Sequence, residues 1–287
     1  MVLFKKTTDL VKHLHRANDA KNSIGFVPTM GALHQGHLSL IQKSKEETGT
    51  TVCSVFINPT QFNNPEDLKK YPVTLEQDIY LLEKSGCDIL FLPDIKEIYP
   101  DGTDFTKHYE LGNLENILEG KYRPGHFQGV CQVMNSLLKI VSPDHLFLGQ
   151  KDYQQCLVIK KLGTLIKERV VINICPTMRE SNGLAMSSRN LRLNDKEKMQ
   201  ASEIFKCLCF MRDNVSKGDV TDLKQAATDT LKQNGFVVDY AEIANAENLS
   251  TVITWDGEEK LVLLIAAYLN DVRLIDNLLP ASQNFKS

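Results

Sequence analysis

Two histidines three residues apart occupy a place in the chain that suits phosphate binding. His34 and His37 belong to the segment PTMGALHQGHLSL, where a β-type run ends and an amphipathic helical pattern begins. Free N–H groups and the helix dipole favour an anion at a helix N-terminus, and histidine donors can stabilise negative charge that builds up on phosphate oxygens. The segment therefore predicts a phosphate-binding turn with the candidate nucleotide-binding residues Met30, Gly31, Ala32, Leu33, His34, Gln35, Gly36 and His37.

A second chemical segment is Gly149-Gln150-Lys151-Asp152, which follows another β-type run. Ligands of open α/β folds bind at the carboxyl edge of the sheet, so this segment is predicted to lie there. Lys151 offers a positive charge to phosphate. Asp152 has two interpretations of equal weight, because it can accept a hydrogen bond from a ribose or cap the next helix.

Two hydroxyls and a guanidinium come together in Met186-Ser187-Ser188-Arg189. A guanidinium can hold phosphate oxygens through two parallel hydrogen bonds. The pattern favours a mobile loop that clamps phosphate over a turn that only caps a helix.

The elements that carry these segments alternate between β-rich runs and helical patterns, which is typical of a parallel sheet flanked by helices. The predicted strands are Ile24–Pro28, Thr51–Ile57, Cys87–Leu92, His145–Leu148 and Val170–Cys175. A helix is predicted after Thr74, which would form a capping box with Gln77, and this helix would end at Gly86. Another helix is predicted to end before Pro143.

The pattern changes after about Arg179. Helices are predicted near Asp195–Asp213 and over Thr221–Gln233, followed by strands at Phe236–Ile243, Leu261–Tyr268 and Val272–Ile275. The predicted fold class is therefore α/β, with a Rossmann-like doubly wound parallel sheet in residues 1–178 and a smaller α+β domain in residues 179–287.

Composition narrows the class of protein. The 287 residues have a hydrophobic content of 42% and a charged content of 24%, as ordinary globular proteins do. The net charge of −3, with scattered Lys and Arg, disfavours a nucleic-acid partner. The longest apolar run, Leu261–Leu269, is too short to span a membrane, and charges in the first turns argue against a signal peptide.

Seven cysteines without a CxxC pair are interpreted as free thiols in a reducing compartment, which predicts a cytoplasmic protein.

The motifs also carry a family resemblance. His34-Gln35-Gly36-His37 resembles the HxGH signature of the nucleotidyltransferase superfamily, and the longer segment around it resembles pantothenate synthetases more narrowly. Further strings show the same likeness, and the serine–arginine string stands where the superfamily has its KMSKS loop. These strings are FINPTQF at 56–62, RPGHF at 123–127, GQKDYQQ at 149–155 and RESNGLAMSSRN at 179–190.

This resemblance implies an ATP-dependent ligase that joins pantoate to β-alanine through a pantoyl adenylate, with release of pyrophosphate and then AMP. It implies that His34, His37, Lys151 and Arg189 are catalytic. It extends the ATP-binding set to Gly149, Gln150, Lys151, Asp152, Met178, Met186, Ser187, Ser188 and Arg189. It also implies that the smaller domain is a lid over the site and that the protein is a homodimer.

For the other substrates, the resemblance implies that Gln61, Gln155 and Arg123 bind pantoate and that Gln61 also contacts β-alanine. Mg²⁺ is expected with ATP. Glu76 and Asp78 are the nearest acids, but no metal ligand is assigned, because Mg²⁺ takes many of its ligands from phosphate and water. Two other functions stay open: a nucleotidyltransferase that stops at a nucleotidylated product, and a nucleotide-sensing module without turnover.

Overall fold

The computed structural model describes residues 1–18, 23–104 and 107–280. Within these residues a six-stranded sheet has the order β1-β4-β3-β2-β5-β6, and every neighbouring pair is parallel. Its strands are β1 (Val2–Phe4), β2 (Ile24–Thr29), β3 (Thr50–Val55), β4 (Ile89–Phe91), β5 (His145–Gly149) and β6 (Val171–Cys175). The central strand β2 has the later strands β3 and β5 on its two sides, so the chain reverses direction across the sheet at β2/β5. Such a switch point opens a crevice at the carboxyl edge.

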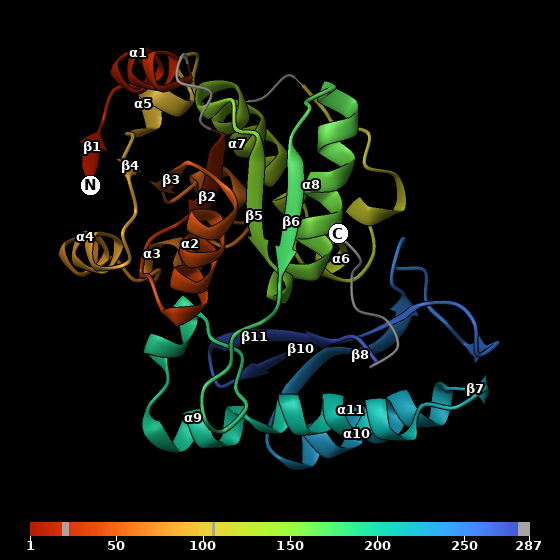
Figure 1. Ribbon diagram of the computed structural model, residues 1–287. Helices are drawn as coiled ribbons and strands as arrows, with labels where there is room; N and C mark the ends of the chain where they lie inside the picture. Colours follow the sequence, from red (N-terminus) through yellow and green to blue (C-terminus); the bar gives the residue numbers. More distant parts are fainter. Residues whose placement is uncertain (19–22, 105–106, 281–287) are drawn as a thin grey trace.

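Side chains on the strands alternate between two apolar layers, because successive residues of a strand face opposite sides of a sheet. On β2, Phe26 belongs to the layer that contains α1, α7 and α8, while Val27 belongs to the layer that contains α2 and α4. Helices therefore cover both faces of the sheet (Figure 1). The helices of this part are α1 (Thr7–Asn18), α2 (Gln35–Glu47), α3 (Pro65–Lys69), α4 (Leu75–Lys84), α5 (Ile95–Ile98), α6 (Glu119–Tyr122), α7 (His126–Val141) and α8 (Tyr153–Ile166).

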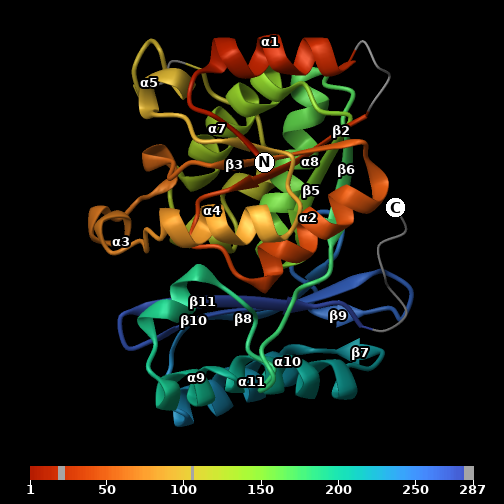
Figure 2. The same cartoon turned by 60° about the vertical axis from the view of Figure 1, so that its left-hand side comes forward.

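The C-terminal part has its own antiparallel sheet of order β11-β10-β8 and its own apolar core. This small sheet lies between the parallel-sheet part and the helices α10 and α11 (Figures 1 and 2). Its elements are α9 (Asp195–Ala201), α10 (Glu203–Asn214), β7 (Gly218–Asp219), α11 (Thr221–Gln233), β8 (Val237–Asn245), β9 (Thr254–Trp255), β10 (Leu261–Leu269) and β11 (Val272–Leu278). Short 3-10 helices lie at η1 (Pro59–Gln61), η2 (Gly112–Glu115), η3 (Gln150–Asp152) and η4 (Ser188–Arg192).

The predicted fold class is confirmed, and two local expectations are corrected. The Thr74 side chain makes no capping hydrogen bond; its hydroxyl instead donates to Asp78 Oδ1 at 3.0 Å, so the predicted capping box with Gln77 is wrong. The helical region near Asp195–Asp213 is divided at Ser202 into α9 and α10. The edge strand β1 was not predicted, since its three residues are too few to show a period.

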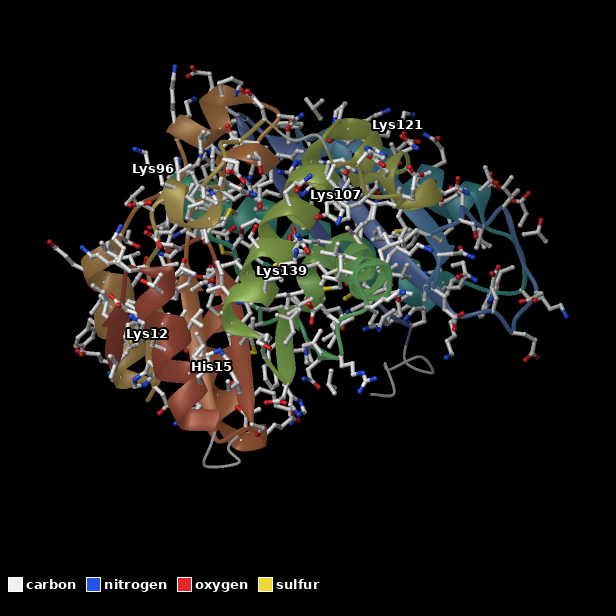
Figure 3. The ribbon with its side chains drawn as sticks, turned by 90° about the horizontal axis from the view of Figure 1, so that it is seen from above. Lys12, His15, Lys96, Lys107, Lys121 and Lys139 are labelled. Atoms are coloured by element: carbon white, nitrogen blue, oxygen red, sulfur yellow. The ribbon has the colours of Figure 1, made fainter. Side chains whose placement is uncertain are left out.

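The end of the molecule that is remote from the small sheet is formed by α1, α5, α7 and their neighbours. Figure 3 looks down on it and labels Lys12 of α1, Lys96 of α5 and Lys139 of α7. These lysines come from separate elements, so this face carries positive charge without a single basic segment. None of the helices formed by the described residues is long and apolar enough to cross a membrane.

Candidate active site

The turn after β2, residues 30–37, is here called the glycine turn. Gly31 and Ala32 have φ angles of 80° and 49°, in the left-handed region. The buried carboxylate of Asp78 on α4 accepts hydrogen bonds from Ala32 N at 2.9 Å and Leu33 N at 2.8 Å. A Cβ at Gly31 would lie 2.9 Å from Asp78 Oδ2, so glycine is required there. Asp78, considered above as an acid near Mg²⁺, is thus engaged in holding the turn.

The two histidines begin α2 and bond to the backbone through the same ring atom. His34 Nδ1 accepts from Gly36 N at 3.1 Å, and His37 Nδ1 accepts from His34 N at 3.3 Å. A neutral imidazole carries one N–H, so a ring that accepts at Nδ1 carries its proton on Nε2. Both histidines therefore have an Nε2–H that the backbone does not use.

The electrostatic surroundings keep these histidines neutral. Burial first, and then His37 and Lys151, lowers the pKa of His34 from 6.5 to about 3. Burial and then Lys151 lowers the pKa of His37 to about 4. At neutral pH the pair consists of uncharged hydrogen-bond donors, and the permanent cation beside them is Lys151.

Lys151 lies where β5 ends, in the short helix η3, as the sequence predicted. Its side chain is only 17% exposed, and its Nζ is 3.9 Å from Asp152 Oδ1. Asp152 occupies the N-cap position of α8 but makes no side-chain capping bond, so the capping interpretation of Asp152 is wrong. Half of its side chain is exposed to the cleft.

The segment from Met178 to Arg192, here called the serine–arginine loop, returns to the glycine turn. A backbone hydrogen bond from Met186 N to Met178 O closes it at 2.9 Å. Ser187 accepts from Arg189 N and caps η4, while the buried Ser188 donates to Ala32 O at 3.0 Å. The loop is therefore both a cap and a contact with the glycine turn, and its two hydroxyls do different things.

Arg189 crosses the cleft to α3. Its NH2 group donates to Asp67 Oδ2 at 2.7 Å, and its guanidinium lies 5.8 Å from the centre of the Tyr71 ring. Arg192 shares the same carboxylate at 3.2 Å and also pairs with Asp271 of the small sheet. Asp67 thus pairs with two cations at once, and the sequence reasoning did not identify it.

Gln61 lies beside the glycine turn in a fixed orientation. Its Oε1 accepts from Asn58 Nδ2 at 3.1 Å, and its Nε2 approaches Met30 Sδ at 3.3 Å. Its backbone oxygen accepts from Nδ1 of the buried His126 at 2.8 Å. With its proton on Nδ1, His126 accepts at Nε2 from Arg123, 3.2 Å away, and burial lowers the His126 pKa to about 3. Asn58 and His126 thus orient Gln61 and Arg123.

Arg123 has two cations and two carboxylates around it, with Arg189 and Arg273 opposed by Glu119 and Asp67. Burial and the nearby Arg189 lower its pKa to about 10, and its nearest carboxylate, Glu119, is 3.8 Å away and is bound more closely by Arg273 at 2.7 Å. Arg123 therefore remains available to an anionic ligand. Gln155 lies in the first turn of α8, partly buried, and lines a small cavity together with Arg123, Lys151 and Asp152.

Five of the residues predicted for the site line one cleft of about 270 Å³ between the two parts of the chain: Arg123, Lys151, Asp152, Ser187 and Arg189. Met30, Gly31 and Ala32 line a separate cavity beside Asp78, and Gln155 lines the small cavity described above. His34 and His37 lie close enough to Lys151 for its charge to lower their pKa values, and Gln61 contacts Met30. Four residues of the site were not predicted from the sequence: Asn58, Asp67, His126 and Asp276. The first three lie within or near the FINPTQF and RPGHF strings, whereas Asp276 has no motif around it.

A doubly wound sheet with a histidine-bearing turn and basic loops around its switch point is the arrangement of nucleotide-dependent α/β enzymes. Residues 2–279 match the family model described as pantoate-beta-alanine ligase. The pantothenate synthetase of Cytophaga hutchinsonii is 43% identical over 97% of this chain and 99% of its own. That of Flavobacterium psychrophilum is 40% identical over the same shares.

Solved structures show the same likeness. The pantothenate synthetase of Thermus thermophilus superposes with a TM-score of 0.89 at 37% identity, covering 97% of this chain and 99% of that one. The pantoate-beta-alanine ligase of Francisella tularensis, solved in complex with beta-gamma ATP and β-alanine, gives 0.80 at 38% identity and covers 98% of each chain. The chain belongs to the pantoate–β-alanine ligase family, and it is a ligase.

Proposed function

We propose that this ligase forms pantothenate in two half-reactions at the cleft described above. In the first, a carboxylate oxygen of pantoate attacks the α-phosphorus of ATP, the bond to the β-phosphate breaks, and pyrophosphate leaves. In the second, the β-alanine amine attacks the acyl carbon of the pantoyl adenylate and AMP leaves. No covalent bond to the protein is needed.

The observation that carries this proposal is the convergence of the neutral histidine pair with Lys151 and Arg189 at the switch point of the sheet. Charge moves onto the leaving pyrophosphate as the first reaction proceeds. Donors that are already oriented stabilise such charge without reorganisation. The two Nε2–H groups supply hydrogen bonds, and Lys151 and Arg189 supply positive charge.

The remaining residues of the predicted ATP site are proposed to hold ATP in place. Most backbone N–H groups of the glycine turn are already used within the turn, because Ala32 N and Leu33 N donate to Asp78, and His34 N and Gly36 N donate to the histidine rings. The turn is therefore proposed to favour phosphate through the helix dipole at the start of α2 and through the two Nε2–H groups. The others are Gly149, Gln150, Asp152, Met178, Met186, Ser187 and Ser188. When the triphosphate binds, Arg189 leaves Asp67 for the phosphate oxygens or binds Asp67 and the phosphate at the same time.

Pantoate is proposed to lie between Gln61, Gln155 and Arg123, with β-alanine entering near Gln61. Support comes from the fixed amide of Gln61 next to Met30 and from the incompletely neutralised guanidinium of Arg123. Side-chain amides can form hydrogen bonds with hydroxyl and carboxylate oxygens without adding charge beside the phosphates. The two ligands of the Francisella tularensis complex, an ATP form and β-alanine, are consistent with this assignment.

Mg²⁺ is proposed to arrive as the partner of the triphosphate. It prefers oxygen ligands and usually keeps several waters. Among residues 1–18, 23–104 and 107–280 there is no group of three or more His, Cys, Asp or Glu side chains that could hold a metal. The Asp152 carboxylate, half exposed to the cleft, is the acid of the predicted ATP site that could receive a water of Mg²⁺.

Three broader expectations remain part of the proposal. The division into residues 1–178 and 179–287 follows the two sheets, which Figure 2 shows in separate parts of the molecule. Residues of the smaller part line one side of the cleft, as those of a lid would. The family resemblance supports a homodimer. The seven free cysteines fit a cytoplasmic protein.

The decisive experiment is to incubate the protein with ATP, Mg²⁺ and pantoate, with and without β-alanine, and to follow pyrophosphate, AMP and pantothenate. We expect pyrophosphate in both mixtures but pantothenate and AMP turnover only with β-alanine. An adenylated product that accumulates and ignores the amine would identify a nucleotidyltransferase. Binding of ATP without pyrophosphate release would identify a nucleotide sensor.

A further inference from the structure

Asn277, near the end of β11 in the small sheet, contacts the segment that carries Lys151. Asn277 is only 1% exposed, and its side-chain amide is fully engaged. Its Nδ2 donates to Gln150 O and to Lys151 O, both at 2.9 Å, and its Oδ1 accepts from Gln150 Nε2 at 3.1 Å. A single side chain from the C-terminal part thus holds two consecutive carbonyl groups of the N-terminal part.

This segment is a short connection between two elements, because Gly149 ends β5 paired with Cys175 and α8 begins at Tyr153. Lys151 lies in η3, a 3-10 helix of three residues that has no side-chain cap. Such short helices have poor hydrogen-bond geometry and depend on their surroundings. Asn277 adds two hydrogen bonds to the backbone from which the Lys151 ammonium group extends, between the ends that β5 and α8 fix.

The neighbouring residue ties the same strand end to the serine–arginine loop. Asp276 is 4% exposed, and its Oδ1 accepts from Arg179 NH2 at 3.1 Å. Its Oδ2 makes an ion pair with Arg179 NH1. Arg179 also lies 3.9 Å from the centre of the Phe205 ring and begins the loop that leads to Ser187. Two successive residues of β11 therefore reach the two segments that supply Lys151 and Arg189.

We propose that Asn277 is a positioning residue for adenylate formation, which acts by holding Lys151 in register with His34 and His37. It touches no reacting atom, so its effect passes through Lys151. The C-terminal part is then a structural component of the ATP site as well as a cover for it. This inference rests on the proposed function, because it assigns Asn277 to the first half-reaction.

The test compares wild type with Asn277→Ala and Asn277→Leu. The leucine variant keeps about the same size and adds no charge but loses both donors to the carbonyl groups, so it carries the test if the alanine variant does not fold. Two readouts are used: calorimetric affinity for a non-hydrolysable ATP analogue with Mg²⁺, and single-turnover pyrophosphate release with ATP and pantoate. We expect pyrophosphate release to slow by about tenfold to a hundredfold, the scale for a catalytic group displaced by about an ångström.

Val272→Ala is the matched control for lost stability. Val272 lies on the same strand and is 1% exposed in the core of the small sheet, without a contact to Lys151. Urea unfolding shows how much stability each variant loses. We expect Val272→Ala to keep the wild-type rate within about twofold although it is destabilised, since the loss of one core contact leaves the folded protein in large excess.

A double-mutant cycle with Lys151→Ala shows whether the effect passes through Lys151. If it does, Asn277→Ala adds less than about twofold to the loss already caused by Lys151→Ala, because the two substitutions share one interaction. The inference is overturned by full additivity, by an unaffected Lys151→Ala, or by an Asn277 variant that releases pyrophosphate at the wild-type rate. Wild type without pyrophosphate release would instead overturn the proposed function.

Discussion

The glycine turn and the serine–arginine loop meet at the same cleft but are held in opposite ways. The turn is fixed by buried hydrogen bonds within the parallel-sheet part, above all the two from Ala32 and Leu33 to Asp78. The loop is fixed by charged pairs to other parts of the chain, through Arg189 to Asp67 and through Arg179 to Asp276. Buried hydrogen bonds are costly to break, whereas the partly exposed pair of Arg189 with Asp67 contributes little net stability and can exchange partners easily.

The two regions also differ in charge. The turn presents neutral imidazoles, whose pKa values are lowered by burial, and the loop presents guanidinium groups that stay charged. A prebuilt set of neutral donors suits stabilisation of a transition state, and an adjustable set of cations suits capture of the triphosphate. The turn thus contributes neutral donors in a fixed geometry, and the loop contributes positive charge.

The largest expected effect comes from the turn. We predict that His37→Ala slows pyrophosphate release with ATP and pantoate by at least about a hundredfold, the scale for one lost stabiliser of transition-state charge. The affinity for ATP should fall far less, because Lys151 and Arg189 remain. Rapid-quench kinetics and calorimetry give the two numbers.

His15→Ala is the matched control. His15 is an exposed histidine on α1, at the far end of the molecule (Figure 3). It should keep the wild-type rate within about twofold, as surface substitutions usually do. Adenylation at the wild-type rate in His37→Ala would remove the turn from the chemistry and leave the loop as the main catalytic region.

The second prediction concerns the support of the turn. Asp78→Asn leaves one oxygen for two backbone N–H groups and places an amide donor against another donor. We predict a loss of about 1–3 kcal/mol in the free energy of unfolding, measured in urea, together with slower adenylation. Glu76→Gln, on the exposed side of the same helix, should change neither.

An Asp78→Asn variant that loses activity without losing stability would contradict this view of Asp78. It would place the carboxylate in the chemistry rather than in the support of the turn. The two measurements together therefore separate a structural acid from a metal-binding one.

The difference between the regions also explains what the sequence could predict. The turn, the strands on either side of the switch point and Lys151 were found because their signals are local: a β-type run, a glycine and a helix start follow one another. Family resemblance then extended these signals to Gln61, Gln155 and Arg123.

The contacts that hold the loop could not be predicted in this way. Arg189 and its partner Asp67 are separated by 122 residues, and Gln150 and Asn277 by 127. No periodic pattern connects residues so far apart, because only the packing of the small sheet against the large one brings them together. Asp78 was noticed as an acid, yet its partners at Ala32 and Leu33 lay outside any local pattern.

The third prediction weakens the loop alone. Asp67→Asn removes the charge that holds Arg189 and Arg192 in the cleft, where Arg123 repels Arg189. If the ion pair pre-orients Arg189 for phosphate, the KM for ATP should rise about fivefold, within the range of one coupling of roughly 1 kcal/mol. Steady-state kinetics at saturating pantoate and β-alanine provide the value.

Glu66→Gln is the control, because Glu66 is exposed. Among the ion pairs of the described residues, Glu66 takes part only in the one with Lys69. It should leave the KM unchanged. A lower KM in Asp67→Asn would show that Asp67 competes with the triphosphate instead of preparing Arg189 for it, and the loop would then be restrained rather than pre-oriented.

The smallest effect is expected from pH, and it tests the neutral character of the turn. The folded-state pKa values of about 3 for His34 and about 4 for His37 lie below the ordinary 6.5. The unfolded chain therefore takes up protons as the pH falls below about 6.5, while the folded chain does not. The contribution of the pair to stability is fully present above pH 6.5 and decreases as the pH falls toward 4.

Nitrogen NMR of labelled histidines measures the protonation state of each ring directly, because the chemical shifts of the two ring nitrogens differ between the two tautomers and the cation. Between pH 7.5 and about 5, we expect both rings to stay neutral with the proton on Nε2, and His34→Gln and His37→Gln to assign the signals. Since the turn then keeps the same donors throughout, any change in adenylation rate over this range has to come from other groups, such as the substrates. A midpoint near 6.5 for either ring would show that the turn carries positive charge of its own, and the division between neutral turn and charged loop would fail.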